Sequence, residues 1–250
     1  MSIAELNKVA KQGDRIMSIT QLTETPATNR MNATRRSAFI DISIFGVVFW
    51  SVLLSLRYAG VENIGFWTAS ASVATGAALI AIRKESWRDY GLRADGDARF
   101  VLSRAFEVLI LTACVAFGVM VLATVLGYPP SESVVLPQPD TLPGFLLDLV
   151  FGVWIAAAIG EELIFRGFLL TKFTTLFSGG RRALVLAVLA QAVWFGVGHA
   201  SQGVNTMIMA SVTGAVLAIF FLTRARRSLL PLIIAHGLID TVIVTMNYFS

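Results

Sequence analysis

The sequence predicts an all-α polytopic membrane protein, a bundle of about seven transmembrane helices. Hydrophobic residues make up 56% of the 250 residues and charged residues only 14%, whereas a soluble domain has roughly 25% charged residues. Apolar runs recur along most of the chain, and a helix needs ~20 such residues to cross the hydrocarbon core of a bilayer. The charged residues are concentrated in short segments between these runs, as expected for loops that join membrane spans.

Two regions are predicted: a cytoplasmic N-terminal tail at 1–37, which is mostly polar, and a transmembrane domain at 38–250. The predicted spans are 38–57, 64–82, 105–126, 142–177, 183–200, 205–222 and 229–248. The run at 142–177 is too long for one simple crossing. It is either a single long helix or two helices broken near Gly160, which would give eight spans.

The distribution of basic residues predicts the orientation of the spans. Eighteen of the twenty Lys and Arg residues lie in the N-terminal tail and in the segments 83–104, 171–182 and 223–228. The intervening loops and the C-terminal end have none. Because cytoplasmic loops of membrane proteins are rich in Lys and Arg, the N-terminus is predicted inside and the C-terminus outside. The net charge of +4 follows from these loops and does not indicate a nucleic-acid partner. The amphipathic segment 83–104 is expected at the membrane surface, with Trp87 and Tyr90 in the headgroup layer.

Three polar patches interrupt the apolar runs, and they contain both histidines of the chain. The patches are Gly160-Glu161-Glu162-Leu163-Ile164-Phe165-Arg166, Phe195-Gly196-Val197-Gly198-His199 and His236-Gly237-Leu238-Ile239-Asp240. Ionisable side chains within a membrane are costly, so they usually have a partner or a function. The patches therefore indicate a reaction centre inside the membrane.

The two glutamates of the first patch are expected to differ in role. On a helix, Glu162 and Arg166 are four residues apart and share a face, so they are predicted to form a structural ion pair. Glu161 points about 100° away around an α-helix and stays free. A carboxylate in such a position suits a general base.

Distances along the chain predict which groups come together. Glu161 lies nineteen residues before Gly180, and His199 lies nineteen residues after it. In an antiparallel helical hairpin that turns at Gly180, these two residues lie at the same depth. His236 and Asp240 share one face of the last span at a similar depth. We therefore expect Glu161, His199, His236 and Asp240 to converge.

Two kinds of chemistry fit these four groups. In the first, Glu161 and His199 activate a water molecule while His236 and its neighbour stabilise the oxyanion. In the second, His199, His236 and Glu161 bind Zn2+, which lowers the pKa of the bound water. The sequence has no His-Glu-x-x-His pattern, so the metal alternative depends on residue types alone.

The three patches resemble the three motifs of the CPBP (Abi-like) family, which includes type II CAAX prenyl endopeptidases and bacteriocin-processing or bacteriocin-immunity membrane proteins. The matching residues are Glu161, Glu162 and Arg166 for the first motif, Phe195 and His199 for the second, and His236 and Asp240 for the third. The resemblance covers about 142–245, less than half of the chain.

The resemblance implies an all-helical intramembrane endopeptidase, and in the prenyl-protease branch the first Glu and the second-motif His act on water. Members of the family are described both as metalloproteases and as metal-free glutamate proteases, and a metal-free site is favoured here. In the prenyl-protease branch, a His and an Asn of the third motif stabilise the oxyanion. This chain has Asp240 in the place of that Asn, and an ionised Asp would repel an oxyanion. An alternative role for Asp240 is to orient His236. Phe195 is expected to pack beside the site.

The resemblance also implies the partners and leaves two other functions open. The expected partners are a peptide or membrane-protein substrate and the lipid bilayer, and the expected location is a bacterial inner membrane. One alternative is a non-catalytic bacteriocin-immunity or scaffold protein of the same fold. A less favoured alternative is a proton-coupled transporter that uses Glu161 and the two histidines as a relay.

Overall fold

The computed structural model describes residues 26–61, 64–93, 96–127, 139 and 141–249, and these form helices and turns without a strand. The elements are α2 (Pro26–Tyr58), α3 (Ile64–Arg83), η1 (Trp87–Tyr90), α4 (Ala98–Val125), α5 (Leu142–Leu147), η2 (Asp148–Leu169), α6 (Leu170–Leu176), α7 (Gly180–Gly198), η3 (Ala200–Gln202), α8 (Val204–Thr223) and α9 (Leu230–Phe249). Most of the predicted tail, residues 1–25, lies outside the described residues. Residues 26–37 extend the first helix.

Within the described residues, seven helices are long and apolar enough to cross a membrane. They are Met31–Tyr58, Ile64–Arg83, Ala98–Val125, Leu142–Leu176, Gly180–Gly198, Val204–Thr223 and Leu230–Phe249. Large apolar side chains such as Phe106, Phe117 and Met246 are exposed on the outside of the bundle, where a water-soluble protein would rarely place so many. The predicted all-α membrane bundle is confirmed, and the protein is an integral multi-pass membrane protein.

The long apolar run is a single helix, not two. Its 35 residues run from Leu142 to Leu176 through α5, η2 and α6 without a break at Gly160. The middle part, Asp148–Leu169, is π-helical, whereas an α-helix was expected. π-Helical backbone is rare and is often found at functional sites. The helix is longer than a simple crossing requires.

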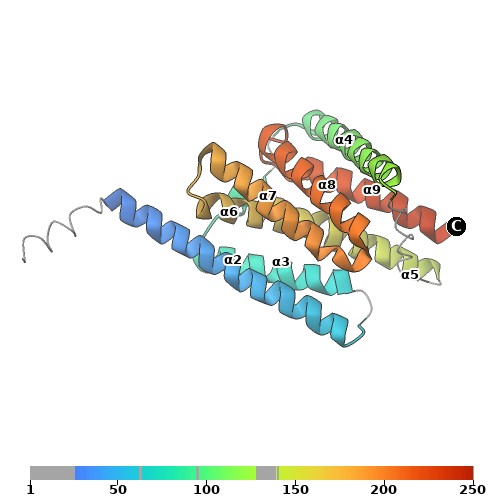
Figure 1. Cartoon of the computed structure of the whole chain (residues 1–250), viewed down its shortest axis with the longest axis horizontal. Coiled ribbons are helices and arrows are strands. Elements are labelled where there is room, and N and C mark those ends of the chain that lie inside the picture. The colour runs from blue at the N-terminus through green and yellow to red at the C-terminus, as the bar shows by residue number, and fades with distance from the viewer. Residues whose placement is uncertain (1–25, 62–63, 94–95, 128–138, 140, 250) are drawn as a thin grey trace, which may run out of the picture.

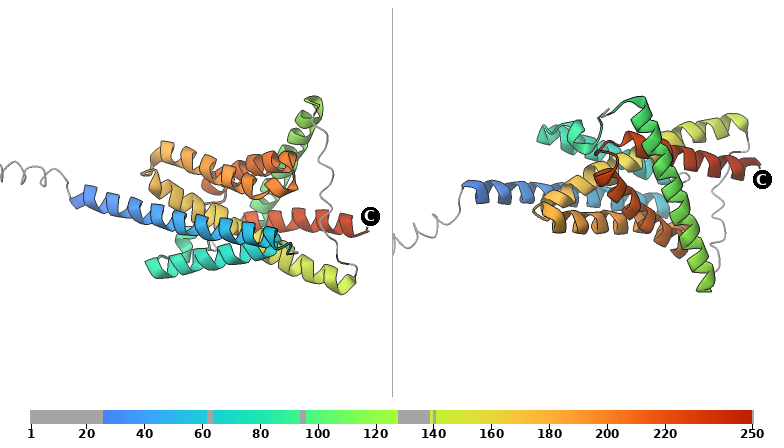
Figure 2. Two further views of the ribbon diagram at one scale, coloured as in Figure 1. Left: turned by 60° about the horizontal axis from the view of Figure 1, so that its bottom comes forward. Right: turned by 90° about the horizontal axis from the view of Figure 1, so that it is seen from above.

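This long helix runs through the centre of the bundle, and the other helices pack around it. The helix pair α2 and α3 lies on one side, and α7 and α8 form an antiparallel hairpin beside it (Figure 1). The η2 segment contacts α3, α7 and α9, while α4 packs on α8 and α9 on the side away from α2 and α3 (Figure 2). The three polar patches therefore come from neighbouring elements.

The segment after α3 differs from its prediction. Trp87 is 38% exposed, but Tyr90 is only 2% exposed and does not lie at the surface. Its ring stacks on Phe168 with centroids 6.0 Å apart, and its hydroxyl donates a hydrogen bond to Glu85. Burial, and then this hydrogen bond, raise the pKa of Tyr90 well above its usual range. The phenol therefore stays protonated as the donor.

Buried charges tie this segment to the helices at the same end of the bundle. Asp41 is completely buried. Its carboxylate oxygens lie 2.8 Å from Nη2 of Arg83 and 2.9 Å from Nζ of Lys172. Lys172 also pairs with Glu85 at 2.8 Å. One network thus joins α2, α3, the η1 segment and α6. Because burial of an unpaired charge costs several kcal/mol, this network fixes how these elements fit together.

A glycine sets the close approach of α7 and α8. A Cβ on Gly196 would lie 2.6 Å from the backbone oxygen of Met207 and 1.8 Å from Oγ of Ser211. Small residues at helix interfaces allow this kind of contact in membrane proteins. Gly196 belongs to the second polar patch, so the contact also positions the end of α7 that carries His199.

We predict that Gly196→Ala lowers the thermal unfolding midpoint of the purified protein in detergent, because the α7–α8 hairpin must open to admit the methyl group. Overpacking of this kind costs ~1–3 kcal/mol. The matched control is Gly118→Ala on α4, where a Cβ meets nothing within 4 Å. Equal midpoints for the two variants would contradict the close contact.

Candidate active site

Glu162 is the centre of the polar cluster. Its side chain is fully buried, and its Oε1 lies 3.3 Å from Nη1 of Arg166 and 2.9 Å from Nδ1 of His236. The ion pair expected from the sequence is therefore present. From the sequence we expected Glu162 to pair only with Arg166, whereas in the structure it also binds His236 of α9. A single carboxylate thus joins the first and third patches.

Arg166 is covered by the second patch. Its guanidinium lies over the ring of Phe195, 4.4 Å from the centroid, a cation–π contact that favours a positive charge. Phe195 is 5% exposed and also makes edge contacts with Phe165 at 4.8 Å and with His199 at 4.6 Å. Phe195 therefore packs between Arg166 and His199.

The second nitrogen of His236 faces the other two carboxylates. Nε2 lies 3.3 Å from Oδ2 of Asp240 and 3.9 Å from Oε2 of Glu161. Asp240 is one helical turn away on α9, the spacing at which side chains share a face. Both nitrogens of His236 therefore face carboxylate oxygens, an arrangement that is satisfied when both carry a proton. The imidazole is fixed between Glu162 and Asp240.

His199 is placed by the end of α7. It is the first residue after Gly198, and its Nδ1 lies 2.8 Å from the carbonyl oxygen of Phe195. Since a carbonyl only accepts, Nδ1 carries the proton and donates. The neutral ring then has Nε2 as its free acceptor, the form in which a histidine can take a proton from water.

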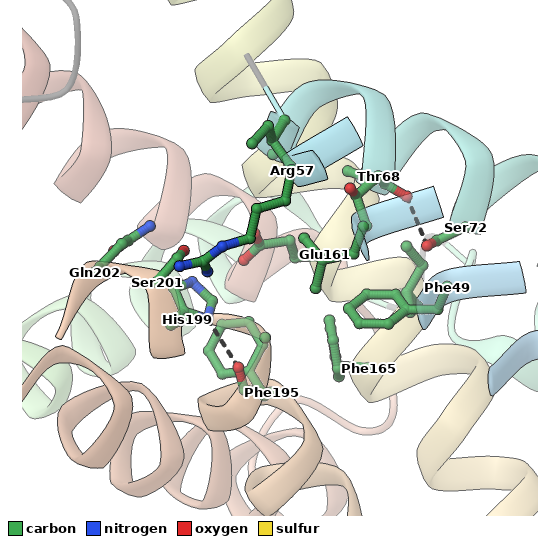
Figure 3. Close-up of a pocket in the computed structure, with 16 residues that line it drawn as sticks. Phe49, Arg57, Thr68, Ser72, Glu161, Phe165, Phe195, His199, Ser201 and Gln202 are labelled. Atoms are coloured by element: carbon green, nitrogen blue, oxygen red, sulfur yellow. Dashed lines mark hydrogen bonds between the residues drawn. The ribbon is translucent and has the colours of Figure 1, made fainter. Parts of the chain in front are cut away.

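A cavity of about 200 Å³ brings Glu161 and His199 together. Figure 3 shows both side chains at its wall, with Phe49, Phe165 and Phe195 around them. The cavity is lined by Phe49, Leu53, Arg57, Ile64, Gly65, Thr68, Ala69, Ser72, Glu161, Ile164, Phe165, Phe195, Gly198, His199, Ser201 and Gln202. The expectation that Glu161 and His199 lie at the same depth agrees with this placement.

His236 and Asp240 do not line this cavity. They lie on the other side of Glu161, whose Oε2 is 3.9 Å from Nε2 of His236. Glu161 therefore lies between the cavity and His236. The structure therefore groups the four predicted residues as two that face the cavity and two that flank Glu161.

The sequence did not identify the cavity residues of α2 and α3. Arg57, Thr68 and Ser72 come from helices far from the three patches in sequence. One signal pointed to Arg57: it and Arg166 are the two Lys or Arg residues outside the basic loops.

The zinc site considered above is not assembled among the described residues. Among the described residues, no three His, Cys, Asp or Glu side chains are placed to hold a metal ion together. Nδ1 of His236 is occupied by Glu162, and its Nε2 faces Asp240. His199, His236 and Glu161 therefore do not form a ligand set, and the chemistry below uses no metal step.

Comparison with known proteins identifies the part of the chain that contains the patches. Residues 142–242 match the family described as Type II CAAX prenyl endopeptidase Rce1-like. This segment includes all seven motif residues from Glu161 to Asp240, and the resemblance to the CPBP family is confirmed. No curated protein and no solved structure matches the chain.

We predict that Glu162→Gln and Glu161→Gln differ sharply in their effect on stability. The first leaves Arg166 buried without its counter-ion, a change that costs ~3–5 kcal/mol. The second changes a side chain that is 22% exposed and whose His236 contact, at 3.9 Å, is longer than the contacts of Glu162. Thermal unfolding midpoints in one detergent provide the measurement. A midpoint for Glu161→Gln as low as that of Glu162→Gln would contradict this division.

Proposed function

We propose that this chain, a multi-pass membrane protein whose residues 142–242 carry an Rce1-like type II CAAX prenyl endopeptidase domain, is an intramembrane endopeptidase that hydrolyses peptide bonds with Glu161 and His199. The family is one of proteases, which supports a protease and its peptide substrates in general. The observation that carries the proposal is the shared cavity of Glu161 and His199 inside the bundle.

In the proposed reaction, a water molecule binds between the Glu161 carboxylate and Nε2 of His199. Glu161 takes one proton as the water oxygen attacks the carbonyl carbon of the scissile bond. The tetrahedral intermediate then collapses, the C–N bond breaks, and the proton passes from Glu161 to the leaving amine. The products are a carboxylic acid and an amine, and no covalent bond to the protein forms.

His236 is proposed to act on Glu161 and not on the oxyanion. Its Nε2 faces Asp240 and Glu161 and does not line the cavity. A proton on Nε2 of His236, 3.9 Å from Oε2 of Glu161, attracts the carboxylate oxygen and holds it in place beside the water. In this role Asp240 orients the ring, as the alternative from the sequence suggested, so its negative charge does not oppose an oxyanion.

The position of the cavity suggests the side of access. Its lining includes Arg57 at the end of α2, Ile64 at the start of α3 and Gln202 after α7. These residues lie at the end of the bundle opposite the α6–α7 turn. With the predicted orientation of the spans, this is the side opposite the N-terminus, and the substrate is proposed to enter there.

We predict that Glu161→Gln lowers the rate of peptide cleavage at least ~100-fold, because an amide cannot accept the proton of the water. The measurement is mass spectrometry of a pool of apolar peptides incubated with purified protein in detergent. The matched control is Glu107→Gln, an acid on α4 that pairs with Arg104 and Arg224 outside the cavity. Cleavage by Glu161→Gln at the wild-type rate would contradict the mechanism. A folded wild-type protein that cleaves no peptide in the pool would favour the immunity or scaffold function.

We predict further that Asp240→Asn retains more activity than Asp240→Ala. The amide oxygen of Asn still accepts a hydrogen bond from Nε2 of His236 and so keeps the ring oriented, whereas Ala cannot. Rates are compared across pH for the three proteins, after their unfolding midpoints are shown to be similar. Equal losses in the two variants, with unchanged pH profiles, would show that Asp240 does not act through the ring.

A further inference from the structure

The orientation of the spans does not explain the position of Arg57. Of the twenty Lys and Arg residues, only Arg57 and Arg166 lie outside the basic segments. Arg166 is buried and paired with Glu162. Arg57 lies in the last turn of α2, at the end of the bundle where the loops have no other Lys or Arg. A cation in such a position suggests a specific role.

The side chain of Arg57 extends into the cavity that holds the proposed reacting groups. Figure 3 shows its guanidinium directed toward the space bordered by Glu161, His199 and Ser201. In the part of the chain that the structure describes, the side chain of Arg57 forms no salt bridge and no hydrogen bond, while its carbonyl oxygen accepts from the amide of Gly60. Glu161, the one acid in the lining, lies beyond salt-bridge distance of it. The guanidinium is therefore available to a ligand inside the cavity.

The chemistry of the cavity indicates what that ligand is. The planar guanidinium presents paired N–H donors that match the two oxygens of a carboxylate. The cavity wall is apolar at Phe49, Leu53 and Ile64, and Arg57 itself is exposed and so open to an incoming ligand. A peptide chain supplies both parts, namely apolar side chains and a carboxylate.

We propose that Arg57 binds a carboxylate of the peptide substrate and so fixes which peptide bond reaches Glu161. This inference depends on the proposed peptidase function. The carboxylate is either the C-terminus of the substrate or an acidic side chain near it. Arg57 is a specificity-determining residue in this account, since it holds one end of the substrate and exchanges no proton with it.

The test uses three synthetic peptides with the same apolar sequence, taken from one that the wild-type protein cleaves. The first ends in a free carboxylate, the second in a carboxamide, and the third in a carboxamide with Asp as its last residue. A charged hydrogen bond changes kcat/KM by about 10- to 100-fold. We expect the wild-type protein to prefer the first peptide, or the third, over the second by this factor. We expect Arg57→Gln to lose the preference and Arg57→Lys to retain part of it.

The control variant is Arg99→Gln, an exposed arginine on α4, which should leave the preference as in the wild type. A wild-type protein that does not discriminate between the peptides would overturn the inference. The inference is also overturned if Arg57→Gln discriminates between the peptides as the wild type does. It is overturned as well if Arg57→Gln slows cleavage of all three peptides equally, since Arg57 would then act in the reaction itself. If the proposed peptidase function itself is wrong, the Glu161→Gln variant will still cleave the peptides. This result is distinct from any change in the preference among the three peptides.

A binding measurement covers the case in which no peptide is cleaved. The thermal midpoint of the Glu161→Gln variant is measured with each peptide, with and without Arg57→Gln. Stabilisation by the acidic peptide that requires Arg57 supports the inference. Stabilisation that requires Arg57 but comes only from vesicles of anionic phosphatidylglycerol, and not from any peptide, would assign Arg57 to a lipid headgroup and overturn it.

Discussion

The buried charge of Arg166 is the constraint on which the rest of the site depends. A guanidinium with no exposed surface, inside an apolar helix, requires a counter-ion, and Glu162 supplies it at 3.3 Å. Glu162 also binds His236 at 2.9 Å, which ties α9 to the long helix. Phe195 covers the guanidinium from α7. One ion pair thus links the three elements that carry the polar patches, and Glu161, next to Glu162 in the chain, is left facing the cavity.

The three carboxylates of the cluster show how environment separates the roles of like groups. Glu162 has no exposed surface, whereas the Glu161 and Asp240 side chains are 22% and 29% exposed. The fully buried acid is paired with two cationic or hydrogen-donating groups and serves the fold. Asp240 is held against His236, and of the three carboxylates Glu161 is the one that lines the cavity. Half of the sixteen lining residues come from α2 and α3, outside the segment that matches the protease family, so substrate selection is expected to depend on this other part of the chain.

Much of this arrangement could be predicted from the sequence, because the features concerned are local or follow from length. Hydropathy located the seven spans, the i,i+4 spacing predicted the pair of Glu162 and Arg166, and equal chain distances from Gly180 placed Glu161 opposite His199. The contact of His236 with Glu162 joins two different helices and depends on how α9 packs against η2, so it could not be predicted from local spacing in the sequence. Tyr90 is buried because its segment packs on η2, where its ring stacks on Phe168, although the composition of the segment is typical of a membrane surface. The π-helical backbone of η2 was missed because the sequence was interpreted with α-helical spacing.

The most direct test of the account is a double-mutant cycle on cleavage, with Glu161→Gln, His199→Gln and the double variant. If Glu161 and His199 act together on one water molecule, each single variant already removes the activated water, and the double variant is expected to be about as slow as the slower single variant. Losses that multiply in the double variant would show that the two residues act independently. Such a result would contradict the claim that the cavity they share is a single reaction centre.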